Sequence, residues 1–400
     1  MPAFAATALS FDAAIAQALQ GTPQMLAARS KLEASRLAAI SAGELPDPKL
    51  ALGVENFPVG GPDRYSLTRD FMTMQRIAVM QEFPNRDKRD ARVAVANARI
   101  ERSEAERKLA LSLVQRETAL AWIKRYTVER QLAQLDQLLE ENKLFADAIR
   151  AQLAGGRAAA ADAVLPRQEA ALLAERRDEL LMQQQQANAA LQRWVGAAAA
   201  APLAGSPPQW RLEREHLQQE IQQHPDLQLA YATQRMSEAE LRDAQAMKKS
   251  DWGLEFAYQR RGPQYGDMVS VQLTFELPFF SAKRQDPQIA ARLAERDSAQ
   301  AEREAMWLEH TQELAAGLAE AERLQRAVTR NRDVQQPLAR EKIELSFAAY
   351  RGGKASLSDV IAARREALEV QLKLSALEGE LQALQARLHY ATEHQEPGKY

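Results

Sequence analysis

The stretch from Met268 to Phe280 reads MVSVQLTFELPFF, and apolar and polar residues alternate strictly along it as far as Leu277. A period of two is typical of a β-strand with one apolar and one polar face. The rest of the chain is rich in Ala, Leu, Gln, Glu and Arg, which are helix-forming residues. A two-faced strand within such a chain therefore needs an explanation.

Composition narrows the class of protein. The chain has 400 residues, of which 26% are charged and only 6% aromatic, and this favours long helices over a compact enzyme. The formal net charge of −2 gives no general attraction to nucleic acid. There is no cysteine, so the given sequence contains no disulfide, thiolate metal site or cysteine nucleophile, and we expect no anchoring through an acylated N-terminal cysteine of this chain.

The sequence contains no clear targeting signal, and this leaves two alternatives for the location of the protein. No run of about 18 apolar residues occurs, so no transmembrane helix is expected. The start, MPAFAATALSFDAA, lacks the basic region and the full hydrophobic core of an intact signal peptide. We expect either a cytosolic protein or a mature chain in which Met1 has replaced a removed signal.

The sequence repeats itself at a separation of about 200 residues. Three landmarks recur in the same order: TPQML at 22–26 and HPDLQ at 224–228, QEFP at 81–84 and FELP at 275–278, and a Gly-Gly pair followed at equal spacing by Asp162 or Asp359. The matching order predicts a duplication. We expect a first repeat over 10–195, a linker over 196–224, a second repeat over 225–392 and a flexible tail over 393–400.

Each repeat follows one plan of a short helix, two strands, a very long helix, a Gly-Gly turn and a returning helix. The short helices are expected at roughly 23–43 and 225–247, and the long ones at about 87–153 and 282–350. A helix as long as the first of these would span roughly 100 Å. Pro337 lies inside the second and should kink it, because proline removes a backbone hydrogen bond.

Small residues recur along one side of each long helix, which would allow other helices to pack closely. The two sets are Ala91, Ala94, Ala98 and Ala105, and Ala291, Ala294, Ser298, Ala301 and Ala305. From the helices alone, an ordinary coiled-coil rod is the favoured interpretation.

The strands argue against a simple rod. Four are expected, at 50–57, 71–83, 252–259 and 268–277. Sorting them by parity gives an apolar face, with Leu50, Leu52, Val54, Phe71, Ile77, Val79, Phe83, Trp252, Leu254, Phe256, Tyr258 and the set from Val269 to Leu277. The opposite face holds Gly53, Glu55, Met72, Met74, Arg76, Met80, Glu82, Gly253, Glu255, Ser270, Gln272, Thr274 and Glu276.

A lipid bilayer would cover such an apolar face without any protein layer. A membrane-spanning strand needs about 9–11 tilted residues. Unpaired strand edges cannot lie in hydrocarbon, and four strands cannot close a barrel around a channel. The sequence therefore predicts an oligomer, with eight strands from two copies or twelve from three, and helices leaving from one rim.

The duplicated helix–hairpin–long-helix plan and the Gly-Gly…Asp turns resemble the outer membrane factors of Gram-negative tripartite pumps, the TolC-like family. The resemblance covers about residues 10–392. The segments LGVENFPVGGPD and SLTRDFMTMQRIAVMQEFPNRDKR are similar to the heavy-metal branch, the CzcC/CusC-like proteins.

This resemblance implies a mainly α fold with a β-barrel. The chain would form a homotrimer with a twelve-stranded barrel in the outer-membrane lipid and a twelve-helix tunnel in the periplasm. It also implies two partners, a periplasmic adaptor and an inner-membrane RND pump. Many relatives are acylated on an N-terminal cysteine, which this chain lacks.

The Gly-Gly turns are candidate functional positions. Glycine is favoured there because a helix C-terminus commonly needs a positive φ. By resemblance, these turns would form the periplasmic tip that narrows the tunnel and docks the adaptor. The candidates are Gly155, Gly156, Arg157, Asp162, Gly352, Gly353, Lys354 and Asp359. The alternative is that the two aspartates, or Ser356 and Ser358, only cap the returning helices.

A second candidate set lines the expected lumen: Glu55, Met72, Met74, Arg76, Met80, Glu82, Glu255, Gln272 and Glu276. Twelve carboxylates from three subunits would favour cations, although a generic wet lumen is the alternative. The methionine thioethers are soft ligands suited to Cu(I) or Ag(I), but methionine also fills space without any metal role.

The remaining histidines and basic residues show no pattern typical of a metal site or an active site. The five histidines, His216, His224, His310, His389 and His394, show no metal-ligand spacing, so no metal site or cofactor is expected. The basic clusters at 86–89 and 283–284 could contact lipid phosphates or simply be solvated. No catalytic constellation or phosphate-binding loop is present, so no enzyme is expected.

The sequence thus predicts a passive outer-membrane exit duct of an RND-type heavy-metal efflux system, gated at its helical tip. One alternative is a TolC-like duct for drugs or secreted proteins. The other, from a different class, is a soluble coiled-coil adaptor or scaffold.

Overall fold

The computed structural model describes residues 8–156 and 160–392. These residues form two compact units, and each unit takes segments from both halves of the sequence. The first unit comprises Met1–Ala28, Arg107–Asp226 and Met306–Tyr400, and the second comprises Arg29–Glu106 and Leu227–Ala305. The compact units therefore do not coincide with the two sequential repeats.

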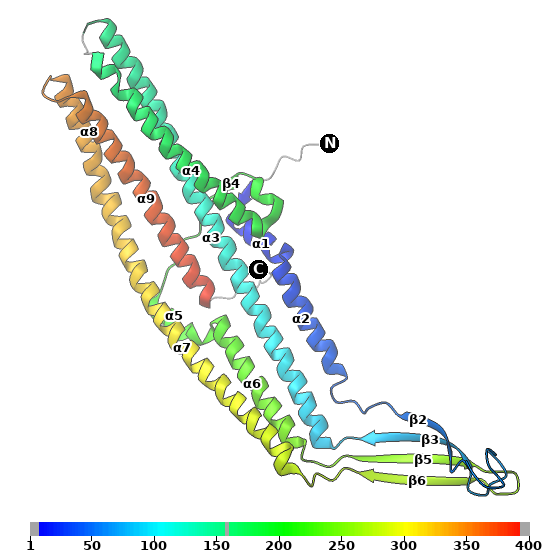
Figure 1. Ribbon diagram of the computed structural model, residues 1–400. Helices are drawn as coiled ribbons and strands as arrows, with labels where there is room; N and C mark the ends of the chain where they lie inside the picture. The colour runs from blue at the N-terminus through cyan, green and yellow to red at the C-terminus, as the bar shows by residue number, and fades with distance from the viewer. Residues whose placement is uncertain (1–7, 157–159, 393–400) are drawn as a thin grey trace. The chain divides into compact units, whose positions relative to one another are not determined.

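A four-stranded antiparallel sheet lies at one end of the second unit (Figure 1). Its order is β2–β3–β5–β6, so the two hairpins lie next to each other and the strands in the middle come from different halves of the chain. The strands are β2 (Lys49–Glu55), β3 (Met74–Phe83), β5 (Trp252–Arg260) and β6 (Met268–Phe275).

The second expected strand begins three residues later than predicted. Residues 71–73 belong to the loop, because Asp70 accepts hydrogen bonds from the backbone N–H groups of Met72 at 2.9 Å and Thr73 at 3.1 Å. The Thr73 hydroxyl, fully buried, donates to the Asn56 carbonyl at 3.0 Å. This local bonding replaces ladder hydrogen bonds, so Met72 is not a strand residue.

The helices of the second unit all join the sheet at the same end of its strands (Figure 1). They are α2 (Pro23–Ile40), the first part of α3 (Arg86–Ala154), α6 (Pro225–Ala246) and the first part of α7 (Gln285–Arg330); the short η4 (Ser281–Lys283) precedes α7. α3 contacts both short helices, through the hydroxyls of Ser35 and Ser103 at 2.8 Å and an ion pair between Arg235 and Glu101 at 2.9 Å.

These contacts cover the small-residue stripe of α3. Ala91, Ala98 and Ala105 are buried, whereas the corresponding stripe of α7 is exposed. The exposed α7 residues are Ala291, Ala294, Ser298, Ala301 and Ala305. The same sequence feature is thus packed in one half of the chain and uncovered in the other.

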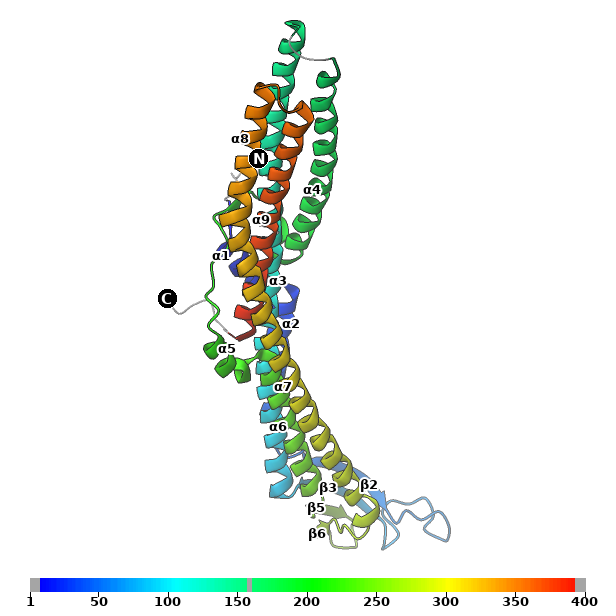
Figure 2. The ribbon, with the colours of Figure 1, turned by 90° about the vertical axis from the view of Figure 1, so that its left-hand side faces the viewer.

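The first unit is a bundle of long helices. In Figure 2, α4 and α9 run alongside the upper part of α3, and α8 runs beside α9. Its elements are β1 (Leu9–Ser10), α1 (Phe11–Gly21), the remainder of α3, η1 (Ala160–Ala163), α4 (Leu165–Val195), η2 (Gly196–Ala200), β4 (Leu203–Ala204), α5 (Arg214–Glu220), η3 (Ile221–Gln223), the remainder of α7, η5 (Asn331–Gln335), α8 (Gln336–Arg351) and α9 (Leu357–Thr392).

The segment expected to be a linker is packed into the core of this unit. Trp122 is fully buried and donates from Nε1 to the Leu9 carbonyl at 3.2 Å. Arg125 donates to the carbonyls of Ala199 at 2.6 Å and Ala201 at 2.9 Å, and both alanines are buried. β4 in the same segment pairs in parallel with β1. The Pro, Gly and Ala bias indicated a loose connection, but small residues are also what close packing around Trp122 requires.

The second long helix is interrupted where proline was expected to disturb it. A π-helical turn, η5, separates α7 from α8, and Pro337 is the second residue of α8. Proline cannot donate a backbone hydrogen bond, and π-turns accommodate such irregularities in long helices. Among the described residues, no helix is both long enough and apolar enough to cross a lipid bilayer.

Candidate functional site

The sheet presents one continuous apolar face to its surroundings. The register places Leu50, Val79, Phe256 and Val271 in one row across all four strands, and Leu52, Ile77, Tyr258 and Val269 in the next. All eight side chains are exposed, from 41% for Tyr258 to 70% for Leu52. Large exposed apolar patches are rare on soluble monomers. The alternation in the sequence thus places these side chains on one face that the rest of the chain does not cover.

The edges of the sheet are also open. Within the described residues, β2 pairs only with β3 and β6 pairs only with β5. An open, apolar edge strand is a template for pairing with another chain.

The opposite face is polar, as parity predicted, but its charges are balanced. Arg76 forms ion pairs with Glu55 at 3.3 Å and with Glu255. Lys49 pairs with Glu82 at 2.6 Å, and Gln272 lies in the same row as Glu255. The carboxylates expected to attract cations therefore already have cationic partners within the chain.

Lys88 forms ion pairs at the helix-proximal end of the sheet, and one of its partners is Glu276, the fourth glutamate of the polar face. Its ammonium is buried, 2.9 Å from Asp251 and 3.5 Å from Glu276. The neighbouring Arg89 donates to the Gly43 carbonyl at 2.8 Å. These two members of the first basic cluster are engaged in the protein, whereas Lys283 and Arg284 of the second are exposed.

Two of the three methionines expected to line the lumen, Met74 and Met80, are too far apart to bind one ion together. Met74 and Met80 lie on the polar face of β3, six residues apart, and Met72 lies in the preceding loop. At about 3.3 Å per residue, six residues separate two side chains by roughly 20 Å. Thioethers of one chain at that distance cannot share a metal ion.

Both Gly-Gly turns contain one glycine that the backbone requires. Gly156 has φ 68° and Gly353 has φ 70°, whereas Gly352 has φ −82° and is not in the left-handed region. After α8, the N–H of Gly353 donates to the Tyr350 carbonyl and that of Lys354 to the Ala349 carbonyl. This is a Schellman motif, which ends a helix sharply.

The two aspartates near the turns have different surroundings. Asp359 and Ser356 form a reciprocal cap at the start of α9, with the Ser356 hydroxyl donating to the carboxylate at 2.7 Å and accepting from the Asp359 N–H at 3.3 Å. The Ser356 bonds hold the pKa of Asp359 below its usual value. Asp359 therefore caps its helix. Asp162 lies half-buried in η1, Lys354 is exposed, and Arg157 lies outside the described residues.

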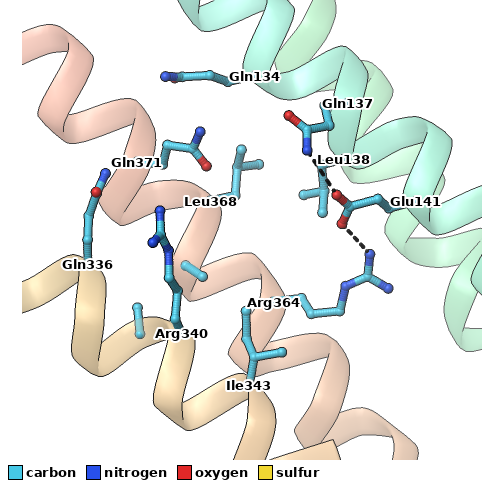
Figure 3. Close-up of a pocket in the computed structure, with 12 residues that line it drawn as sticks. Gln134, Gln137, Leu138, Glu141, Gln336, Arg340, Ile343, Arg364, Leu368 and Gln371 are labelled. Carbon is cyan, nitrogen blue, oxygen red and sulfur yellow. Dashed lines mark hydrogen bonds and ion pairs between the residues drawn. The ribbon is translucent and has the colours of Figure 1, made fainter.

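A cavity of about 150 Å³ lies between α3, α8 and α9 (Figure 3). Its walls are mostly polar, and Glu141 of α3 pairs across it with Arg364 of α9 at 3.0 Å while accepting from Gln137 at 3.3 Å. Arg340 extends from α8 toward the same space. Polar contacts surround this gap, while two apolar clusters also join α3 to α9, one containing Leu135 and Leu368 and the other containing Ile149 and Leu357.

Two of the five histidines come together in space, which their spacing in the sequence did not indicate. His224 and His310 are 86 residues apart, yet their rings stack with centroids 3.9 Å apart beside Asp226. No local pattern could have identified this cluster, because it depends on α7 passing the start of α6.

Comparison with solved structures identifies the fold. VceC, an outer membrane protein of Vibrio cholerae, superposes with a TM-score of 0.79 at 19% identity, covering 96% of this chain and 95% of its own. A membrane protein of Pseudomonas aeruginosa gives a TM-score of 0.81 at 19% identity over 96% and 90% of the two chains. CusC, a transmembrane channel, gives 0.78 at 15% identity over 96% and 91%.

No protein-family model and no curated protein matches the sequence. At these identities the structural matches define the fold, and that fold is the one shared by outer membrane channels. The chain thus has the TolC-like outer membrane factor fold, as the sequence predicted. The match to CusC is no better than the match to VceC, so the superposition does not single out the heavy-metal branch.

Proposed function

We propose that this chain is the outer-membrane channel of a tripartite efflux system, through which substrates leave the cell passively. The observation that carries the proposal is the sheet with an uncovered apolar face and two open edges. Hydrocarbon would cover the face, and neighbouring copies would pair with the edges, since unpaired backbone groups in hydrocarbon cost several kcal/mol each.

Three copies would close the sheet into a twelve-stranded barrel. The exposed stripe from Ala291 to Ala305 on α7 supports this assembly, because small residues let helices of adjacent subunits approach closely. With the sheet in the outer membrane, the helices would extend into the periplasm as a tunnel.

We place the gate at the Gly-Gly turns of the helical hairpins. The turns end α3 and α8, and the hairpins behind them are linked by polar pairs such as Glu141–Arg364 around a cavity. Arg364 is only 18% exposed, and a buried cluster of Ile149, Leu357 and Ile361 also joins α3 to α9 near the turns. Opening of the tip would therefore require breaking both the ion pair and these apolar contacts. A periplasmic adaptor would dock at the turns, and an inner-membrane RND pump would supply the energy.

Heavy-metal cations are the substrate class that we favour. The support is the likeness of LGVENFPVGGPD and SLTRDFMTMQRIAVMQEFPNRDKR to the heavy-metal branch. The charges of the polar face give no further support for metal cations as substrates. The four glutamates there are paired with Arg76, Lys49 and Lys88. We therefore propose a wet, weakly charged lumen and place substrate selection in the partners.

A deletion strain tests the proposed substrate class. Loss of the gene should lower the tolerated concentration of zinc, cobalt, cadmium, copper or silver salts, while drug tolerance stays unchanged, and a plasmid-borne copy should restore metal tolerance. Sensitivity to drugs alone would instead establish the alternative, a duct for drugs or secreted proteins. A soluble coiled-coil scaffold, the other alternative, is disfavoured by the exposed apolar face of the sheet.

A further inference from the structure

A cluster of two histidines and one aspartate lies where the start of α6 meets α7. His224 immediately precedes α6, Asp226 is its second residue and His310 lies in α7. Each side chain offers one potential ligand atom, and the three atoms lie within 4.8 Å of one another. The cluster is separate from the sheet and from the Gly-Gly turns.

The distances within the cluster approach those of a metal site. His224 Nδ1 lies 3.5 Å from Asp226 Oδ2, and His310 Nε2 lies 3.8 Å from the same oxygen. In a tetrahedral zinc site with bonds of about 2.0–2.1 Å, neighbouring ligand atoms are about 3.3–3.4 Å apart. The two carboxylate–imidazole separations are within a few tenths of an ångström of that value. The two ring nitrogens lie within 4.8 Å of each other, and the stacked rings would have to turn so that both lone pairs point at one ion.

Hydrogen bonds already hold both imidazoles in suitable tautomers. His310 Nδ1 lies 3.0 Å from Glu313 Oε2, and since a carboxylate only accepts, the neutral ring carries its proton on Nδ1 and a lone pair on Nε2. The Asp226 backbone N–H donates to the lone pair of His224 Nδ1 at 3.3 Å, so this nitrogen is unprotonated, and an ion would have to displace this long hydrogen bond. A carboxylate on the outer nitrogen is the usual orienting partner of a metal-binding histidine.

Burial and charge are consistent with binding of a cation. The side chains of His224 and His310 are only 13% and 15% exposed, while Asp226 is 35% exposed, so the group is shielded but can be reached from solvent. With both rings neutral, Asp226 and Glu313 carry two negative charges. A divalent cation would neutralise them.

We propose that His224, Asp226 and His310 bind one divalent transition-metal ion of the zinc class, with Glu313 orienting His310. Two imidazoles and one carboxylate suit Zn²⁺, Co²⁺, Ni²⁺ or Cu²⁺ and do not suit Cu(I), Mg²⁺ or Ca²⁺. Water would supply the fourth ligand. The bound ion would clamp the first turn of α6 to α7. Metal binding at this cluster requires neither a pore nor a pump, so its test is independent of the proposed function.

Cobalt titration of the detergent-purified protein, prepared without a polyhistidine tag, tests the proposal. We expect one Co²⁺ per chain, with the visible absorption of a tetrahedral site, and displacement by one equivalent of Zn²⁺. His310→Gln and Asp226→Asn should each weaken binding at least 10-fold. Glu313→Gln should weaken it about 10- to 100-fold, as loss of an orienting partner does.

His216→Gln is the matched control, because His216 also lies beside a glutamate, 3.3 Å from Glu220, but outside the cluster. It should bind Co²⁺ like the unmodified chain. Circular dichroism without metal checks that each variant is folded, and Zn²⁺ should raise the Tm of the unmodified chain and of His216→Gln but not of His310→Gln. Absence of stoichiometric binding, or equal binding by folded His310→Gln, would overturn the proposal.

Discussion

Tyr390 is a residue whose ionisation is linked to the stability of the helical unit. It packs in the core around Trp122, and burial, helped by the Asp12 carboxylate, raises its pKa to about 12. The unfolded chain loses this proton near pH 10. Between about pH 10 and 12 the folded state therefore binds more protons than the unfolded state, and the free energy of unfolding falls as the pH rises.

Urea unfolding followed by tryptophan fluorescence should show this fall, on the order of 2 kcal/mol, because one pKa unit corresponds to about 1.4 kcal/mol. Tyr390→Phe removes the ionisable group and should flatten this part of the pH profile. An unchanged slope in Tyr390→Phe would show that other groups cause the alkaline loss.

Arg76 pairs with two of the four glutamates on the polar face of the sheet. Arg76→Met leaves Glu55 and Glu255 without their shared cation. In a planar bilayer with a KCl gradient, we expect the reversal potential to shift toward that of K⁺, and the shift should shrink at 1 M salt because charges are screened there.

Arg176→Met is the control, because it removes the same charge from an exposed position on α4. It should leave the reversal potential unchanged. Equal shifts in both variants would mean that Arg76 does not line the conducting path.

At the scale of elements, α9 packs closely against α3 where Gly379 faces Thr127. A Cβ added to Gly379 would lie 2.8 Å from Thr127 Cγ2 and closer still to Oγ1, and the threonine is held by its hydrogen bond to the Ile123 carbonyl at 2.8 Å. Alanine in a helix gains about 1 kcal/mol over glycine, whereas overpacking costs about 1–3 kcal/mol. We expect the packing cost to exceed the gain.

Gly379→Ala should therefore lower the Tm measured by circular dichroism. Gly21→Ala, at the end of α1 with no atom within 4 Å of the added Cβ, should leave the Tm unchanged or raise it. A higher Tm for Gly379→Ala would show that α3 and α9 separate easily.

The elements themselves could largely be read from the sequence, because they depend on local patterns. The period of two predicted β5 and β6 within about two residues, and the Gly-Gly pairs marked the ends of α3 and α8. Two predictions were wrong where contacts between segments distant in the sequence decide the structure. The start of β3 depends on Asp70 and Thr73, and the supposed linker is held by Arg125 through two carbonyls.

The sequence predicted which side chains lie on each face of the sheet, but it did not predict the ion pairs between them. Parity alone sorted the apolar and polar sides of the strands, but the partner of Glu55 and Glu255 depends on Arg76 reaching across the sheet. The pairing of Lys88 with Asp251 likewise joins the two halves of the chain. The cluster around His310 could not be foreseen for the same reason, since His310 lies 86 residues from His224.

At the scale of the whole molecule, the two faces of β6 should respond in opposite ways to one added charge. Val271 lies on the apolar face and Gln272, its neighbour, on the polar face, and both are exposed. Arginine on the lipid face of a barrel costs about 2–4 kcal/mol at the bilayer midplane. Val271→Arg should therefore reduce the amount of protein in the outer-membrane fraction, whereas Gln272→Arg should be tolerated.

Fractionation followed by immunoblotting would measure both variants against the unmodified chain. Equal loss in both would indicate a general folding defect, and normal insertion of Val271→Arg would mean that lipid does not cover this face.

The assembly of three chains into a lipid-embedded channel can be tested by the mass and the conductance of the detergent-extracted particle. We expect a particle of three 44.6 kDa chains that must be extracted with detergent and that conducts ions when added to a planar bilayer. A single chain that stays dispersed in buffer without detergent, and that leaves the bilayer silent, would contradict it.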